Sequence, residues 1–207
     1  PVTNTMLEVA TSSNLWVNLF IMVLCAPVAE ELIFRKLLID RLAQYGEGVA
    51  VLFSGLMFGL FHGNLNQFVY AFVLGLCFGF IYVKTGNIRY TIGLHMLVNF
   101  LGSVLGVAIL KWLGDDFLSI ASDPAGMMSY MIGNFGKLIV YFIYIFLLLG
   151  VAIAGIILFI VNLKKIRFLP GMNTLPKGKR FSTTVLNVGM ALYMIVWIVI
   201  IIVQLFQ

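Results

Sequence analysis

Five ionisable side chains and one amide lie within otherwise apolar stretches of this sequence. They are Glu30, Glu31, Arg35, His62, His95 and Asn99, and the two histidines are the only ones in the chain. Ionisable groups are costly in hydrocarbon, so they normally face the interior of a helix bundle or a water-filled cavity. Two histidines and two glutamates in such positions indicate one shared site.

The spacing of these residues predicts which of them can meet. Residues four apart share a helix face, so Glu31 can pair with Arg35, and His95 can lie beside Asn99. Glu30 points about 100° away from Glu31 on a helix. We therefore expect Arg35 to neutralise Glu31 and Glu30 to face a cavity. The alternative is a single ion-pair cluster that only fixes helix packing.

Two hydrolytic mechanisms suit these side chains. Glu30, His62 and His95 could bind Zn²⁺ and leave one position for a reactive water. Without a metal, a buried glutamate can act as general base on water while His95 and Asn99 donate to the oxyanion. Either route would hydrolyse a peptide bond or an ester without a covalent nucleophile, and both remain open on the sequence alone.

The composition places these residues in a membrane protein. Of the 207 residues, 62% are hydrophobic and 10% are charged, and the mean hydropathy is +1.08. Soluble domains are typically about 25% charged. The net charge of +5 arises from basic residues that cluster between apolar runs, as in membrane-protein loops, so a nucleic-acid partner is not expected.

The apolar runs predict an all-α fold, a polytopic transmembrane helix bundle with about six spans in one membrane domain. The expected spans are 14–40, 49–62, 67–83, 90–110, 138–163 and 181–206. The stretch from His62 to Asn66 breaks an apolar run, and the second span is short for a bilayer. Residues 111–137 are expected to form a loop. Because the chain starts at Pro1, we expect sequence upstream, with further helices.

The basic residues also predict the orientation. The segment 164–180 contains Lys164, Lys165, Arg167, Lys177, Lys179 and Arg180. Loops rich in lysine and arginine stay in the cytoplasm, so we expect this loop there, and Asp115 and Asp116 outside. Depth estimates along each helix lead us to expect a site that opens toward the cytoplasm.

Pairs of glycines four residues apart predict close helix contacts. They are Gly55 with Gly59, Gly75 with Gly79, and Gly102 with Gly106, on three consecutive spans. Small residues at this spacing let helix backbones approach closely. We expect these three spans to form a tight inner bundle.

Three motifs together resemble the signature of a known family. They are Glu30-Glu31-x-x-x-Arg35, Phe58-x-x-x-His62 and His95-x-x-x-Asn99, each in a separate hydrophobic span. This pattern is similar to that of the CPBP family, the CAAX proteases and bacteriocin-processing (Abi-type) intramembrane proteases related to the Ras-converting endopeptidase. The resemblance covers Ala29 to roughly Gly106.

The resemblance implies a role for each motif residue. Glu30 would activate water, and His62 would act with it. His95 and Asn99 would either complete a metal site or form the oxyanion hole. Arg35 would hold the glutamate region, with Glu31 as partner, and Phe58 would shape the helix face beside His62. Because the family is classed as metallopeptidase, a zinc cofactor is one expectation.

The expected function is therefore that of a CAAX-type intramembrane (metallo)endopeptidase, which acts on a hydrophobic or lipidated peptide beside membrane lipid. The expected location is the bacterial plasma membrane. Glutamate, histidine and asparagine inside a membrane also mark ion paths, so an ion-coupled transporter is an alternative. A catalytically inactive membrane scaffold is another.

Overall fold

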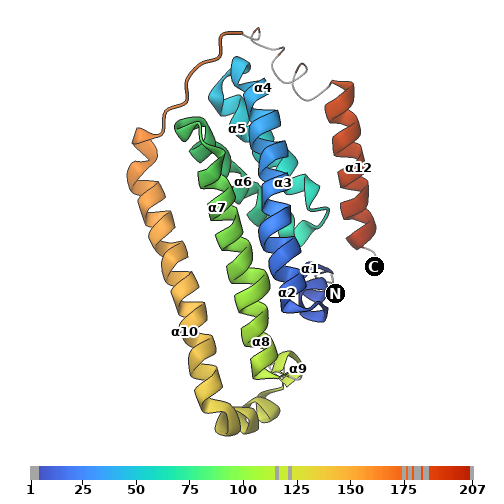
Figure 1. Cartoon of the computed structure of the whole chain (residues 1–207), viewed down its shortest axis with the longest axis vertical. Helices are drawn as coiled ribbons and strands as arrows, with labels where there is room; N and C mark the ends of the chain where they lie inside the picture. Colours follow the sequence, from blue (N-terminus) through green and yellow to red (C-terminus); the bar gives the residue numbers. More distant parts are fainter. Residues whose placement is uncertain are drawn as a thin grey trace.

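The computed structural model describes residues 5–114, 117–120, 123–173, 176, 179, 183 and 187–205. Every regular element in these ranges is helical, and the helices pack as a bundle (Figure 1). In the described part of the chain four helices are long and apolar enough to cross a membrane, and Glu47–Phe61 and Val188–Gln204 are shorter apolar helices. The prediction of an all-α membrane helix bundle is confirmed.

The first long helix carries both glutamates of the site. It runs over Leu15–Tyr45, somewhat beyond the predicted 14–40. Its successive segments are α2 (Leu15–Val17), η1 (Asn18–Cys25), α3 (Ala26–Glu31), η2 (Leu32–Ile39), α4 (Asp40–Leu42) and η3 (Ala43–Tyr45). The segments η1 and η2 are wide π-helical turns on either side of α3. Pro27, the second residue of α3, has no backbone N–H to donate to the preceding turn, which accounts for the widened turns before it.

The helices α5 (Glu47–Phe61) and α6 (Leu65–Thr85) form a tight hairpin. A Cβ atom on Gly75 would lie 2.9 Å from the Cα of Gly55, and one on Gly59 would lie 3.0 Å from the Cβ of Phe72. Only glycine permits this approach, so the predicted close contact between these two helices is present. The hairpin fixes the end of α5, where His62 lies, against the start of α6.

The next long helix passes close to the first one (Figure 1). It consists of α7 (Ile88–Asn99), η4 (Phe100–Gly106) and α8 (Val107–Leu113). The prediction that Gly102 makes a close helix contact is wrong, because a Cβ atom there would have no neighbour within 4 Å. Gly102 instead lines a cavity described below.

The C-terminal part differs most from the prediction. Residues 111–137 were expected to form a loop, but α8 extends to Leu113, α9 covers Phe117–Ile120, and α10 covers Pro124–Asn162 with a kink at Asn134. Proline suits the first position of a helix, since its missing donor is not needed there. The short η5 (Leu163–Lys165) follows α10, and α12 covers Val188–Leu205 within the predicted 181–206. Of the residues used to predict the orientation, Asp115, Asp116, Lys177 and Arg180 lie outside the described ranges.

Candidate active site

The two adjacent glutamates of α3 have different surroundings. The side chain of Glu31 is fully buried, whereas that of Glu30 is 17% exposed. Helical rotation of about 100° between neighbours turns them toward different parts of the bundle. Glu31 bonds to His95 of α7, and its partner Arg35 bonds to Ser54 of α5. Glu30 instead lines a cavity.

Glu31 lies at the centre of a buried hydrogen-bond network. Arg35 donates to both of its oxygens, from Nε to Oε2 at 3.0 Å and from Nη2 to Oε1 at 3.2 Å. The remaining arm of Arg35 donates from Nη1 to the hydroxyl of Ser54 at 2.6 Å, and Ser54 donates to the Phe34 carbonyl at 2.8 Å. A buried ion pair needs such complete hydrogen bonding to be tolerated. The Glu31–Arg35 pair therefore occurs as its spacing predicts.

His95 joins this network from α7. Its Nδ1 lies 3.1 Å from Oε1 of Glu31. A carboxylate only accepts, so Nδ1 carries the proton and donates, and this bond sets the orientation of the ring. The network is thus larger than the predicted pair, because Glu31 holds both Arg35 and His95.

The other ring nitrogen of His95 is directed at Glu30. Its Nε2 lies 3.8 Å from Oε2 of Glu30, which is too long for a direct hydrogen bond. Oε2 of Glu30 is buried and has no hydrogen-bond partner. Buried carboxylate oxygens are nearly always paired, so an exception requires an explanation. A reactive group that pairs only with substrate or water is one such explanation.

Phe58 packs against both histidines. Its ring lies edge-on to His62, with centroids 4.9 Å apart, and edge-on to His95 at 5.5 Å. The backbone carbonyl of Phe58 also accepts from Nδ1 of His62 at 2.8 Å. Since a carbonyl cannot donate, the proton is on Nδ1, and Nε2 of the neutral ring is left as an acceptor. Phe58 thus positions His62 by ring packing and by this bond.

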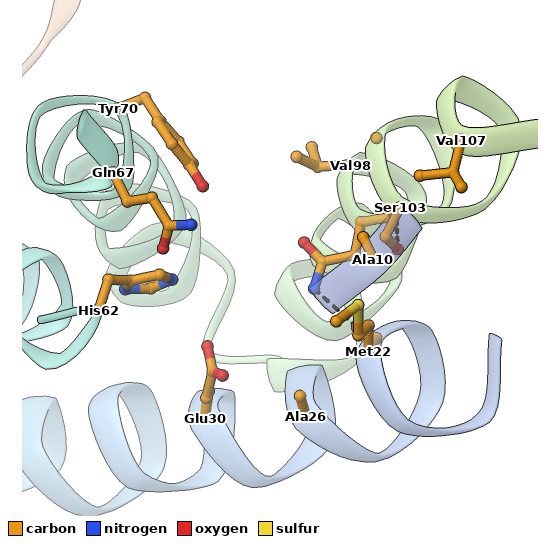
Figure 2. Close-up of a pocket in the computed structure, with 12 residues that line it drawn as sticks. Ala10, Met22, Ala26, Glu30, His62, Gln67, Tyr70, Val98, Ser103 and Val107 are labelled. Atoms are coloured by element: carbon orange, nitrogen blue, oxygen red, sulfur yellow. Dashed lines mark hydrogen bonds between the residues drawn. The ribbon is translucent and has the colours of Figure 1, made fainter. Parts of the chain in front are cut away.

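Glu30 and His62 line the same cavity, from different helices (Figure 2). Its volume is about 380 Å³. The lining residues are Ala10, Met22, Ala26, Glu30, His62, Gln67, Tyr70, Val98, Asn99, Gly102, Ser103 and Val107. Asn99 contributes to the wall, and one of its amide hydrogens is used in a 2.8 Å bond from Nδ2 to the Met22 carbonyl. His95 lies beside Glu30 but does not line the cavity.

The cavity extends away from the basic helix ends. On the first long helix it runs from Glu30 back to Met22, away from Arg41, and on the α7–α8 helix it runs from Val98 to Val107, away from Arg89. These lining residues lie on the side of Glu30 away from the basic ends, which does not favour the expected opening toward the cytoplasm. The depth estimates were measured on each helix separately and could not show where side chains from several helices would leave space.

Among the cavity residues that were not identified from the sequence are Gln67 and Tyr70 on α6. Gln67 is only 3% exposed, and its Oε1 has no hydrogen-bond partner. Figure 2 shows both side chains directed into the cavity from the α6 wall, while Glu30 projects from α3. The available signal was the polar side chain of Gln67, which directly follows the break at His62 to Asn66 and begins the next apolar span.

The predicted zinc ligands do not fit a metal site as arranged. Among the described residues no three His, Cys, Asp or Glu side chains lie close enough together to hold a metal ion. The Nδ1 bonds to Glu31 and to the Phe58 carbonyl leave both Nε2 atoms without a hydrogen bond to any described residue, and Phe58 packs edge-on against both histidine rings. We therefore derive no step through a metal, and zinc stays a prediction to be tested.

Two comparisons with known proteins bear on this site. Residues 12–101, which include every motif residue from Glu30 to Asn99, match the Rce1-like family, described as type II CAAX prenyl endopeptidase Rce1-like. Over 74 residues the chain is 32% identical to a Bacillus subtilis (strain 168) protein named "Putative membrane peptidase YdiL". That segment is 35% of this chain and 30% of the relative, so less than a third of the relative's length is matched. No solved structure gives a significant match.

Proposed function

The chain belongs to the CPBP family of membrane peptidases, and from this premise we propose that it is an intramembrane endopeptidase using water activated by Glu30. The observation that carries the proposal is the carboxylate of Glu30, which lines a cavity and has one buried, unpartnered oxygen. A general base must be free to reach water and must be held in place. Glu30 is free, and its neighbour His95 is held by Glu31.

The proposed reaction is direct hydrolysis. Glu30 takes a proton from water as the water oxygen attacks the carbonyl carbon of the scissile peptide bond. The second amide hydrogen of Asn99, at the cavity wall, would donate to the oxyanion. The carbon–nitrogen bond then breaks, and Glu30 returns the proton to the leaving amine.

The two histidines have different proposed roles. His62 presents an unprotonated Nε2 to the cavity and would orient the attacking water by accepting its second hydrogen. With its proton on Nδ1, His95 would present Nε2 as an acceptor to Glu30 once that carboxyl has taken the proton from water, in the orientation that Glu31 imposes. His95 is then a positioning residue behind the carboxylate.

The proposed substrate is a hydrophobic or lipidated peptide within or beside the membrane. Much of the cavity wall is apolar, with Met22, Ala26, Val98 and Val107 on it. We further propose a bacterial plasma membrane, with segment 164–180 in the cytoplasm. In that orientation the cavity lies toward the outer half of the bilayer, so the peptide would enter from that half.

Cleavage by the purified full chain tests the proposal. Prenylated CAAX peptides and a hydrophobic peptide library would be incubated with the wild-type protein, Glu30→Gln and His62→Ala. We expect Glu30→Gln to lower kcat by about 10²- to 10⁴-fold. Glu47→Gln is the matched control, because Glu47 lies at the start of α5 against Lys84 and does not line the cavity.

Two outcomes would overturn the proposal. Cleavage that survives both Glu30→Gln and His62→Ala would remove the assigned roles. Absence of cleavage, together with ion uptake into proteoliposomes that Glu30→Gln abolishes, would identify a carrier instead.

A further inference from the structure

Gln67 is a buried polar side chain that the proposed mechanism does not use. It is 3% exposed, its Oε1 has no hydrogen-bond partner, and it lines the cavity. Native proteins satisfy nearly all buried polar atoms, so an unpaired amide oxygen in a cavity suggests a ligand that completes it.

A purely structural role for Gln67 would be a helix cap. Asn64 is the N-cap of α6, and its side chain accepts from the Asn66 backbone N–H at 2.8 Å. Gln67 is three residues after this cap, where glutamine often accepts in return from the N-cap backbone N–H. This reciprocal bond is absent, because Oε1 of Gln67 has no partner. The residue therefore does not serve as half of a capping box.

The position of Gln67 suits contact with a bound chain near the reacting bond. Figure 2 shows its carboxamide in the cavity beside the ring of His62, with Glu30 projecting from the α3 side. Tyr70 lies three residues further along α6, on the same helix face, and its hydroxyl also points into the cavity. Together these side chains make α6 a polar wall across from the apolar residues Ala26 and Val98.

We propose that Gln67 binds the main chain of the substrate peptide, an inference that rests on the proposed peptidase function. A carboxamide presents one acceptor and a donor group in one plane, as a peptide group does. Oε1 would accept from one substrate N–H, and Nε2 would donate to a substrate carbonyl. Gln67 would thus bind the peptide backbone directly and hold it near the scissile bond.

This contact has a consequence for specificity. Main-chain hydrogen bonds do not depend on side-chain identity, so Gln67 would accept many sequences but require an extended peptide with an unsubstituted amide. The substrate class is then a peptide segment with free backbone amides near the scissile bond. A lipid ester or a free lipid chain would not satisfy Gln67.

Ester-substituted peptides test the proposal. Starting from a cleaved peptide, each amide flanking the scissile bond is replaced in turn by an ester, which removes one N–H. For the wild-type protein, we expect one analogue to show a KM about tenfold higher, the effect of one lost hydrogen bond. The variant Gln67→Met should raise KM for the parent peptide about tenfold and abolish the penalty for that analogue, with kcat changed less than about twofold.

The matched control is Asn66→Leu. Asn66 is the exposed neighbour of Gln67 on α6 and does not line the cavity. Both substitutions replace an amide by an apolar side chain of similar shape. Asn66→Leu should keep the wild-type KM and the ester penalty. A second variant, Gln67→Asn, retracts the amide by one methylene, preserves a polar side chain, and should also raise KM.

Binding measurements separate this proposal from the peptidase assignment. The same peptides are titrated into Glu30→Gln protein, with and without Gln67→Met. An ester penalty in binding that Gln67→Met removes would support the contact even if the wild-type protein cleaves nothing. Glu30-dependent cleavage with a KM unchanged by Gln67→Met, or with the ester penalty retained, would overturn the role of Gln67 alone.

Discussion

Nδ1 of His95 lies 3.1 Å from Oε1 of Glu31, so residues 64 positions apart share a buried hydrogen bond. Glu31 also holds Arg35, and one carboxylate thereby connects the packing of the first long helix to the orientation of His95. Substitutions at this carboxylate and at Arg35 should therefore separate its effect on stability from its effect on activity.

Breaking the Glu31–Arg35 pair should be strongly destabilising. Arg35→Met leaves a buried carboxylate without its cation, and we expect a loss of about 3–5 kcal/mol in the free energy of unfolding. The double variant Glu31→Met with Arg35→Met removes both charges and should recover much of that loss. Its activity should stay low, because His95 has lost the acceptor that orients it. Unfolding in mixed micelles and peptide cleavage measure the two effects.

The control for this pair lies on the same helix. Lys36 and Asp40 are also four residues apart, and Nζ of Lys36 lies 2.8 Å from Oδ2 of Asp40. Both of these side chains are exposed. Lys36→Met should cost less than about 1 kcal/mol. Equal losses for Arg35→Met and Lys36→Met would show that burial of the first pair has no energetic effect.

Close packing of α5 against α6 should make Gly75 intolerant of a side chain. The variant Gly75→Ala would place a Cβ atom 2.9 Å from the Cα of Gly55, so the helices must separate. We expect a cost of about 1–3 kcal/mol in unfolding free energy. Cleavage should fall as well, since these helices position His62 and Gln67.

Gly93 on α7 provides the comparison, because a Cβ atom there meets nothing within 4 Å. Gly93→Ala should be neutral or slightly stabilising, since alanine is the better helix former. If Gly75→Ala and Gly93→Ala had the same effect in mixed micelles, the close approach of α5 and α6 would be refuted.

Removal of metal ions should leave cleavage unchanged. The described residues do not gather three metal-binding side chains. Activity is measured before and after chelation, beside elemental analysis of the purified protein and a zinc peptidase treated identically. Stoichiometric zinc, with activity lost on chelation and restored by zinc, would contradict this expectation and favour the metal route.

The contact of Glu47 with Lys84 should give a pH-dependent contribution to stability. Partial desolvation raises the pKa of Glu47, but the hydrogen bonds from Lys84 and from the Leu169 backbone N–H outweigh it and hold the pKa below its usual 4.5. A lowered folded-state pKa stabilises the protein above the unfolded-state pKa, and this contribution disappears as pH falls through the folded-state pKa. Glu47→Gln should therefore lower Tm at neutral pH. The Tm difference between wild type and variant should begin to shrink as the pH falls below 4.5, and it should vanish below the folded-state pKa.

Thermal unfolding of wild type and Glu47→Gln across this pH range provides the measurement. The shift should be small, because the Glu47–Lys84 contact is partly exposed. A Tm difference that persists unchanged at low pH would show that Glu47 does not stabilise the protein through its charge.

The positions of the hydrophobic runs, and of the polar residues within them, were sufficient to predict the helix bundle and the Glu31–Arg35 pair. Apolar runs of about 20 residues can only be satisfied as membrane helices, so the all-α bundle followed directly. The i,i+4 spacing of Glu31 and Arg35 placed them on one helix face, and they do pair. The residues 111–137 were misassigned because glycine and proline suggested a loop, although Pro124 can begin a helix as well as end one.

The sequence by itself thus determined the membrane helices and the residues that cannot face lipid, because both depend on local composition and helical period. Only the tertiary structure decided how these residues combine. It joined His95 to Glu31, packed Phe58 against both histidines and directed Gln67, whose Oε1 has no partner, into the cavity of Glu30. These relationships depend on how α3, α5, α6 and α7 pack together, and the spacing of residues along one helix contains no information on contacts between helices.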